Sequence, residues 1–442
     1  MQHVLRNLQR TFWHVFNSLS LAFYLEGIFQ THSNSKLSFL TIVDNSKLKI
    51  FESSGSKVNN ILVADSSIGE IKLTSKTIVQ KFEIRANSMV EKLRIYLNSQ
   101  IGKLAIYSSF LKKIIFRDAG FIGHFHCRFL VDQATQLIFK NTRFGKLDFE
   151  DTVFPESTTL SASDCSINEL SFRNTCNYGS LFFSNLKSLE KWEDFKRDEK
   201  NNLIFENGEY QFEEKSSPST LRFIDSDLGK VQFINSDLRQ FKKFEFLNTK
   251  MLEVFVAGSQ MPDGEKFQLP KDSNANINEQ KRLAYGQFKR IYENQGDTAG
   301  SLHYLAQEMD AYHAQLREEG RWKNRGELFM LWMNKISTNH GTSWQHGLLS
   351  TIVALVFFYS IFCLLIGYRW DWSDRGFEGL WKLISYAPYY LNPLRDKDSI
   401  FLIEEGDFNA WSRLWDFISR IFLTYFVYQT IQAFRKLGKS SG

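Results

Sequence analysis

The sequence predicts a mainly β N-terminal half that forms an irregular right-handed β-solenoid, followed by an α-helical neck and two transmembrane helices with a re-entrant segment between them. Three observations lead to this fold class. Large apolar residues recur every five positions in the N-terminal half, two long apolar segments lie near the C-terminus, and a charged helical pattern separates the two regions. A chain of 442 residues is also too long for one ordinary core, so several domains are expected.

Residues 1–34 are expected to form an amphipathic N-terminal helix. Their apolar residues follow the spacing of one helix face, and these residues are Val4, Leu8, Phe12, Val15 and Leu19. The start of the chain is basic, but no small-residue cleavage site follows, so the pattern does not indicate a signal peptide. The helix either docks on the solenoid or lies on a membrane surface, and the sequence leaves both possibilities open.

A period of five predicts a pentapeptide-type solenoid over residues 35–255. Neither the helix period of 3.6 nor the strand period of 2 produces such a spacing. In a square β-helix each face takes five residues, and one large apolar residue per face points inward. The large inward residues are Val63, Ile68, Leu73 and Ile78, then Ile101, Ile106, Leu111, Phe116 and Phe121, then Phe139, Phe144, Phe149 and Phe154, and finally Phe223, Leu228, Phe233 and Leu238.

The position two residues earlier also faces inward in such a solenoid, and here it is mostly small or aliphatic. These residues are Ser66, Ile71, Ser109, Ile114, Ala119, Thr142, Leu147, Thr152, Ser226, Val231 and Ser236. Pairs such as Asp65-Ser66 and Asn141-Thr142 mark tight turns, which favour short polar side chains. The period slips near residues 84–98 and 126–137, and a charged insertion at 189–219 predicts a hairpin or a loop that packs on a neighbour.

Residues 256–277 are expected to be a linker, and residues 278–346 a helical neck. Asn-Gln-Gly-Asp separates two helical patterns, as a helix stop followed by a cap does. The second pattern carries an apolar stripe formed by Leu302, Leu305, Met309, Tyr312 and Leu316. This stripe is buried either inside a helical hairpin or between subunits. Residues 327–336 are amphipathic and are expected to lie at the inner membrane interface.

Residues 347–437 are expected to form a transmembrane module. The first span, 348–368, carries no charge and is long enough for a bilayer core of about 30 Å. The second span, 414–434, contains polar groups that need a partner or a watery path. The loop between the spans holds six Lys/Arg and eight Asp/Glu, whereas both outer flanks are basic. The positive-inside rule therefore predicts that the N- and C-termini are cytoplasmic.

The second span carries a slanting polar row, which is expected to line a pore. Its members are Asp416, Arg420, Thr424, Tyr428 and Gln432, at i, i+4 steps. The alternative is that these groups pair between helices in a structural role. Residues 376–393 are apolar, short and interrupted by prolines, as in a re-entrant segment. Ser385, Ala387, Pro388 and Tyr389 stand where potassium channels carry a glycine-rich filter, so a poorly selective pathway is expected.

The stretch from Lys103 to Lys146 is strongly basic, because eight Lys/Arg face two Asp. Such a surface suits a nucleotide or a short single-stranded nucleic acid, although an ordinary solvated surface is the alternative. The candidate ligand-binding residues are Lys112, Lys113, Arg117, His124, His126, Arg128, Lys140 and Arg143.

Catalytic motifs are missing from the sequence. It contains no phosphate-binding glycine loop, no HExxH and no nucleophile elbow, so we expect neither an enzyme nor a cofactor or metal site. The four cysteines form no CxxC, and free thiols in a reducing compartment are expected.

These features together resemble a group of bacterial membrane proteins that join pentapeptide-type repeats to a two-helix ion-channel-like module. The segment EQKRLAYGQFKRIYENQGDTAGSLHYLAQEMDAY is similar to the helical hairpin of that group, and YQTIQAFRK is similar to the end of its last helix. The resemblance implies a ligand-gated homo-oligomer, by the channel plan a homotetramer, in the bacterial inner (plasma) membrane.

The arrangement also resembles the channel effectors of anti-phage systems such as Hailong, in which single-stranded DNA oligomers hold the channel shut. That resemblance implies antiviral defence by abortive infection, and a partner enzyme that makes the ligand. The competing interpretation is a membrane-anchored solenoid scaffold that binds a protein partner without conductance.

Overall fold

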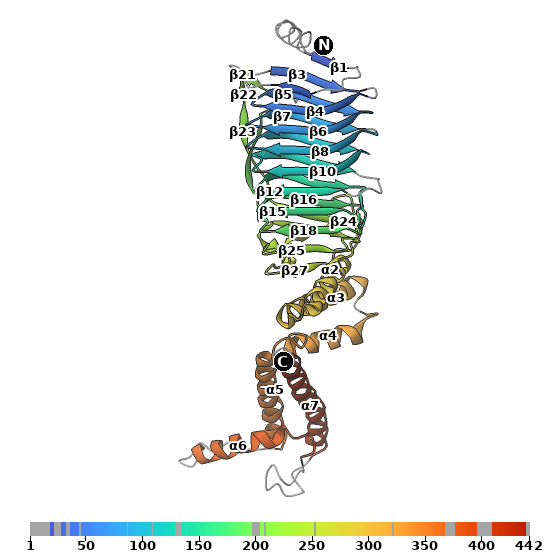
Figure 1. Cartoon of the computed structure of the whole chain (residues 1–442). Helices are drawn as coiled ribbons and strands as arrows, with labels where there is room; N and C mark the ends of the chain where they lie inside the picture. Colours follow the sequence, from blue (N-terminus) through green and yellow to red (C-terminus); the bar gives the residue numbers. More distant parts are fainter. Residues whose placement is uncertain are drawn as a thin grey trace, which may run out of the picture. The chain divides into compact units, whose positions relative to one another are not determined.

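The computed structural model of the chain describes residues 18–21, 28–31, 36–43, 46–85, 87–107, 109–128, 135–196, 204–206, 209–251, 253–320, 322–366, 376–395 and 409–438. The chain divides into two compact units, Met1–Gln280 and Lys281–Gly442. Figure 1 shows stacked strands in the first unit and helices in the second.

The N-terminal unit is a β-solenoid whose strands alternate between two parallel sheets. Along its main path, sheet 1 contains β1 (Ser18–Leu21), β3 (Lys36–Ile42), β5 (Lys57–Ala64), β7 (Ile78–Arg85), β9 (Gln100–Tyr107), β11 (Phe121–Arg128), β13 (Arg143–Glu150), β16 (Ser166–Arg173), β24 (Thr220–Ile224), β26 (Lys243–Leu247) and β28 (Phe267–Gln268). Sheet 2 contains β2 (Ile28–Thr31), β4 (Lys47–Ser54), β6 (Ser67–Thr74), β8 (Met89–Tyr96), β10 (Phe110–Arg117), β12 (Gln136–Lys140), β15 (Thr159–Ser163), β18 (Ser180–Ser184), β25 (Val231–Ile234) and β27 (Phe255–Ala257). The predicted β-solenoid is therefore confirmed.

Short strands β14 (Val153–Phe154) and β17 (Cys176–Asn177) pair with each other, and β19 (Lys187–Ser188) pairs with β16.

The five-residue period describes the core of the solenoid. Every predicted large inward residue is buried except Ile78, whose place is taken by Val79. Ser75 and Lys76 both have positive φ before this strand, so one additional residue enters the corner and shifts the register. The predicted second inward positions are all buried as well. Phenylalanine rings stack between turns, with centroids 4.9 Å apart for Phe116 and Phe139, which accounts for the abundance of phenylalanine.

Corners of the solenoid use a left-handed Asp or Asn followed by a small residue. At one corner Asn141 has a φ of 48°, and Thr142 Oγ1 donates to the carbonyl of Lys140 at 3.0 Å. Asn141 Nδ2 donates to Asp118 Oδ1 of the preceding turn at 2.9 Å, so corners also bond to one another. Asn and Asp tolerate the left-handed region better than most residues, which explains their place here. The same conformation recurs at Asp65, Asp151, Asn174, Asp225 and Asn235.

The ends of the solenoid differ from the predicted boundaries. Ser18–Leu21 and Ile28–Thr31 are strands, which corrects the helix expected over residues 1–34 for its described part, while residues 1–17 lie outside the described residues. β27 and β28 add a further turn within the region expected to be the 256–277 linker.

The charged insertion forms a hairpin, as one of the two predictions stated. β20 (Lys191–Phe195) pairs antiparallel with β23 (Phe212–Ser216), and β21 (Phe205–Glu206) pairs with β22 (Glu209–Tyr210). Phe195 is buried, and its ring would lie 3.1 Å from a Cβ placed on Gly102, so the hairpin packs on sheet 1. Asn168 donates to the carbonyls of Leu189 and Ser217 and so fixes the base of the hairpin.

The C-terminal unit is helical. Its helices are α2 (Ile277–Asn294, which begins in the first unit), α3 (Thr298–Gly320), α4 (Arg325–Thr338), α5 (Trp344–Leu365), α6 (Gly376–Tyr390) and α7 (Ala410–Gly438). The rings of Tyr292 and Tyr304 stack 5.4 Å apart, so α2 and α3 form an internal hairpin. In the predicted α3 stripe, Leu302 and Leu316 are buried. Packing of this region between subunits stays a prediction.

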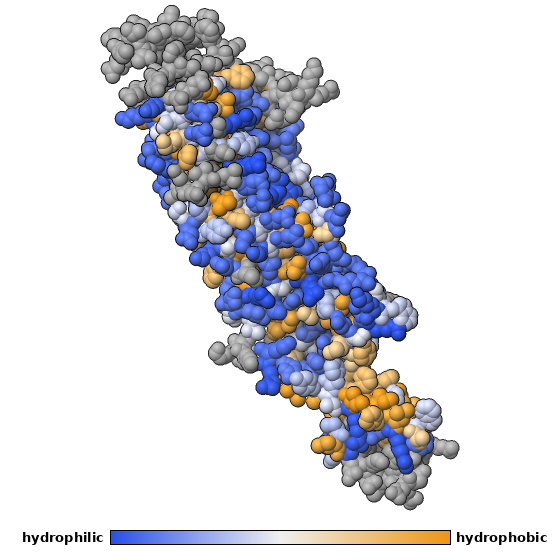
Figure 2. Space-filling model, turned by 90° about the vertical axis from the view of Figure 1, so that its right-hand side faces the viewer, coloured by the Kyte–Doolittle hydropathy of each residue, from blue (hydrophilic) through white to orange (hydrophobic). Residues whose placement is uncertain are grey.

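One helix, α5, is long and apolar enough to cross a membrane. Its exposed side chains include Leu349, Val353 and Val356, which suits contact with lipid. In Figure 2 the solenoid surface is mostly hydrophilic, whereas hydrophobic side chains gather over the C-terminal helices.

Candidate functional sites

Helices α5 and α7 lie side by side and antiparallel over their whole length. Trp415 Nε1 donates to the carbonyl of Phe358 at 2.9 Å, and the hydroxyls of Thr351 and Thr430 are 3.0 Å apart. At one end Asn409 Nδ2 donates to the carbonyl of Leu365 at 3.2 Å. At the other end the rings of Trp344 and Phe434 meet, with centroids 6.1 Å apart. The two helices therefore begin and end at matching levels.

Four members of the predicted polar row lie on α7 away from its contact with α5. Thr424 and Tyr428 are exposed, and Arg420 and Gln432 are half-buried. Gln432 Nε2 donates to Tyr428 Oη at 2.9 Å, one helical turn away. Within one chain, these side chains therefore form a continuous polar strip on an otherwise apolar surface.

Asp416, the fifth member of the row, is buried and ion-paired instead. Its Oδ1 accepts from Arg395 Nη2 at 2.6 Å and Nε at 3.1 Å. Its Oδ2 accepts from Arg420 Nε at 2.9 Å, which is the i, i+4 pair visible in the sequence. Arg395 has only 1% of its side chain exposed. One carboxylate thus serves two arginines.

Two further residues complete this cluster. Arg395 lies over the ring of Tyr390 at 3.8 Å, and its Nη2 donates to Ser419 Oγ at 2.8 Å. Tyr390 Oη donates to the same Ser419 Oγ at 2.9 Å. We call Tyr390, Arg395, Asp416, Ser419 and Arg420 the arginine clamp. It fastens the end of α6 and the residues after it to the first turns of α7.

Part of this cluster could be predicted from the sequence, namely the Asp416–Arg420 pair, but not the contribution of Arg395. A carboxylate within an apolar helix requires a cationic partner, so Asp416 by itself predicts one. Arg395, Arg413 and Arg420 all lie close enough in sequence to be that partner. Only the fold selects Arg395, because α6 ends beside α7.

Helix α6 covers most of the segment predicted to be re-entrant, 376–393, and a re-entrant path stays a prediction. Figure 1 shows the helix running crosswise to α5 and α7 and pointing away from them. It is attached by Tyr390, whose ring lies 5.1 Å from Tyr359 and 5.3 Å from Phe362 of α5. Of the residues predicted at a filter, Ser385, Pro388 and Tyr389 are exposed and Ala387 is half-buried.

The predicted basic patch is divided between the two sheets. Its members on sheet 2 are Lys112, Lys113, Arg117 and Lys140, and its members on sheet 1 are His124, His126, Arg128 and Arg143. Several are already paired: Lys112 Nζ lies 3.0 Å from Glu91, and Arg128 Nη2 lies 2.6 Å from Asp151. Neighbours across a solenoid sheet are twenty or more residues apart in the chain, so a charge count along the sequence overlooks such partners.

Both histidines belong to an ion-pair cluster on sheet 1, centred on Asp148. Asp148 Oδ2 lies 3.2 Å from His126 Nδ1 and 3.6 Å from His124 Nε2. Arg173 Nη2 and Lys146 Nζ approach the same oxygen at 3.0 Å and 3.5 Å. We call these five residues the Asp148 cluster.

The pKa of Asp148 is held well below its usual range. Burial acts in the opposite direction, but the nearby imidazoles of His124 and His126, the second of them within hydrogen-bond distance, and the charge of Lys146 outweigh it. His124, His126 and Asp148 also have the spacing of metal ligands, since their ligand atoms lie within 4.8 Å of one another. Lys146 and Arg173 already neutralise Asp148 and would repel a divalent cation, so the contacts favour a structural ion cluster.

Replacing Asp148 with asparagine should destabilise the solenoid by about 1–3 kcal/mol at pH 7, because Lys146 and Arg173 lose the buried carboxylate that they share and keep only Glu169 and Glu150 as partners. The partial exposure of Lys146 and Arg173, 25% and 33%, limits the effect by letting water solvate them. Since the pKa is lowered in the folded state, this stabilisation is present above about pH 4 and is lost as the pH falls further.

Hydrogen–deuterium exchange of residues 121–150 in the full-length protein measures this change. D118N is the matched control, because Asp118 lies exposed at a corner and Asn is accepted there. Equal exchange rates in D148N and D118N would contradict the structural role of the cluster.

Three candidate ligand-binding residues keep an uncompensated charge. Among the residues that the structure describes, Lys113, Arg117 and Lys140 have no ion-pair partner. All three lie on sheet 2, and Arg117 stands directly beside Lys140 in the β10–β12 register. We call them the sheet 2 cations. Arg143 lies on the other sheet, where its Nε donates to the carbonyl of Gly120 at 3.1 Å.

Comparison with protein-family models, with curated proteins and with solved structures gives no match to this chain.

Proposed function

We propose that the protein is a homo-oligomeric, poorly selective ion channel in which α5 and α7 both cross the membrane and the α7 polar row lines the pore. The observation that carries this proposal is the position of that row. It lies on the face of α7 turned away from α5, on a helix that is matched to α5 at both ends.

Both helices are expected to cross together. If α5 spans the bilayer, α7 is carried through the same thickness, because contacts join the two helices from Asn409 to Phe434. Hydrocarbon would then surround Arg420, Thr424, Tyr428 and Gln432, which is unfavourable unless water or another protein surface satisfies them. Assembly of several copies around the row supplies both. By the plan of tetrameric channels, we propose four copies.

The solenoid is proposed to be the regulatory domain. The sheet 2 cations (Lys113, Arg117 and Lys140) suit an anionic ligand, for which we propose a nucleotide or a short single-stranded nucleic acid made by a partner enzyme. The setting that follows from the resemblance is antiviral defence at the bacterial inner membrane, with both termini in the cytoplasm.

A scaffold that is only anchored in the membrane is the second candidate. The specific observation in its favour is that, among the described residues, α5 alone meets the requirements of a span by length and composition. In that case α7 would pack on α5 without lining a water path, and the solenoid would bind a protein partner.

Recording from purified full-length protein in planar bilayers separates the two candidates. We expect step-like currents whose size changes little between potassium and sodium, because the chain lacks the glycine-rich carbonyl filter. Addition of nucleotides or of short single-stranded DNA should change the open fraction, and K113E/R117E/K140E should remove that response. K112E is the control, because Lys112 is already paired with Glu91. Protein that inserts without current under all these conditions would support the scaffold instead.

A further inference from the structure

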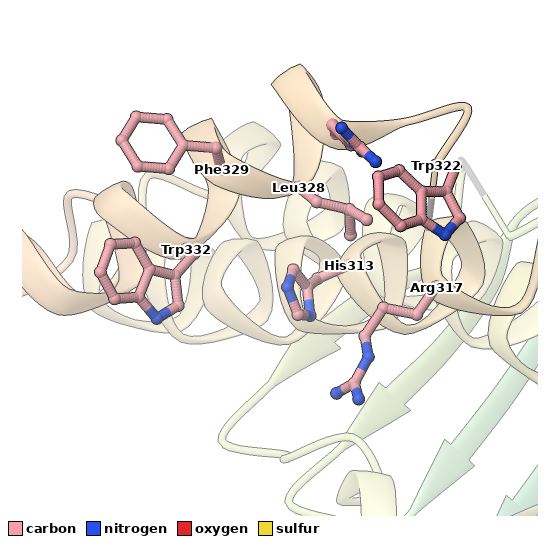
Figure 3. A pocket seen from close by; sticks show the side chains of 7 residues that line it. His313, Arg317, Trp322, Leu328, Phe329 and Trp332 are labelled. Atoms are coloured by element: carbon pink, nitrogen blue, oxygen red, sulfur yellow. The ribbon is translucent and has the colours of Figure 1, made fainter. Parts of the chain in front are cut away.

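A hollow of about 650 Å³ lies between α3 and α4, just before the first membrane span. Figure 3 shows His313 and Arg317 on α3 and Leu328, Phe329 and Trp332 on α4 around it, with Trp322 at one end. Arg325, at the start of α4, completes the lining. The hollow therefore combines two guanidinium groups with three large aromatic side chains.

The two arginines of the hollow make no ion pair within the part of the chain that the structure describes. Arg325 lies over the ring of Trp322 at 3.1 Å. The pKa of His313 is lowered, first by burial and then by the charge of Arg317.

Nearby acidic groups are engaged elsewhere. Glu327 accepts from Tyr312 Oη at 2.6 Å. Asp310 accepts from Lys335 Nζ at 2.7 Å and lies 3.2 Å from His340 Nε2. These contacts fix α3 to α4, and none of them pairs a carboxylate with Arg317 or Arg325.

One face of α4 is apolar and exposed. Phe329 and Met330 are exposed by 52% and 64%, although Leu331 and Met333 of the same helix are buried. Trp322, just before the helix, is exposed by 81%. Aromatic residues that flank a membrane span prefer the level of the lipid headgroups.

The position of α4 indicates what covers this face. Ser350 Oγ of α5 donates to the carbonyl of Ser337 at 2.6 Å, and Tyr425 Oη of α7 donates to Asn334 Oδ1 at 2.6 Å. The C-terminal end of α4 is thereby fixed beside the first turns of α5. Its exposed apolar face continues into the apolar surface of the span, so the adjacent occupant is the bilayer.

We propose that this hollow binds the phosphate headgroup of an anionic phospholipid, with Arg317 and Arg325 on the phosphate and with Phe329 and Trp332 beside the acyl chains. The proposal rests on the membrane position of α5 given under the proposed function. Guanidinium groups donate paired, charge-assisted hydrogen bonds to phosphate oxygens. In a zwitterionic lipid the headgroup ammonium offsets the phosphate charge, so the two arginines should favour an anionic lipid.

Native mass spectrometry of the full-length protein in detergent tests this site. Added phosphatidylglycerol should be retained in preference to phosphatidylcholine, and R317A/R325A should reduce that preference by roughly tenfold or more, because two charge-assisted contacts are lost. R317K/R325K keeps the charge without the planar fork and should fall between the two. K230A/R290A is the charge-matched control, since both residues are exposed and lie outside the hollow.

Unchanged lipid retention in R317A/R325A overturns the proposal. Displacement of the lipid by glycerol 3-phosphate would also overturn it, since the site would then take a soluble phosphate. Loss of oligomer mass in R317A/R325A with no change in lipid would indicate a second copy as the occupant. If the protein retains phosphatidylglycerol but gives no current, the lipid site is supported and the channel proposal is contradicted. Failure of one proposal can therefore be distinguished from failure of the other.

Discussion

Replacing Arg395 with methionine is expected to destabilise the C-terminal helices by about 3–5 kcal/mol, because Asp416 would remain buried with one of its two cations removed. Arg395 is almost fully buried, and it also donates to the carbonyl of Tyr390 at 2.6 Å and to Ser419. Its loss should release the end of α6 from α7. Thermal unfolding of the full-length protein in detergent measures the change.

The double variant R395M/D416N distinguishes an ion pair from simple loss of packing. Replacing both residues should recover part of the loss, since no buried carboxylate is then left with one of its two cations missing. R413M is the matched control, because Arg413 lies exposed in the first turn of α7. If R395M were as stable as R413M, the arginine clamp would not contribute to the stability of the C-terminal helices.

Introducing cysteine at Thr424 is the second large expected effect. In the proposed channel this position lies in the pore-lining row, so a positively charged methanethiosulfonate reagent should reach it and reduce the current by roughly tenfold, through bulk and like-charge repulsion of cations. The background variant is C176S, because Cys176 is exposed whereas Cys127, Cys165 and Cys363 are buried. Currents in planar bilayers before and after the reagent give the readout.

Val356 provides the comparison for this experiment. It is exposed on α5 at a similar depth, since Thr351 meets Thr430 and Phe358 meets Trp415 on either side of that level. V356C should face lipid and keep its current, because the charged reagent needs water to reach a thiol. If the reagent inhibited both variants equally, or inhibited neither, the pore-lining position of the polar row would be contradicted.

The solenoid core could be predicted from the sequence because its inward positions are set locally. A strand turns the same side inward at fixed steps, so Phe139, Phe144 and Phe149 could be identified as core residues by spacing alone. The prediction missed Val79, where two left-handed residues add one position to a corner. Corner length changes the register without changing the apolar pattern, so spacing alone could not reveal it.

The ion-pair partners of charged residues were predictable only within one helix. The Asp416–Arg420 pair follows from helical geometry, since side chains four positions apart lie on one face. Arg395 reaches the same carboxylate from 21 positions away, through the end of α6. Likewise Lys112 and Arg128 appeared unbalanced until the solenoid brought Glu91 and Asp151 beside them.

The sequence by itself therefore determined the repeating core, the long apolar helix α5 and the polar row of α7, because each depends on side chains spaced regularly along one element. The tertiary structure decided the ion partners, the division of the basic patch between two sheets and the crosswise direction of α6. An ion pair forms wherever folding brings opposite charges within about 4 Å, and that distance is independent of their separation along the chain.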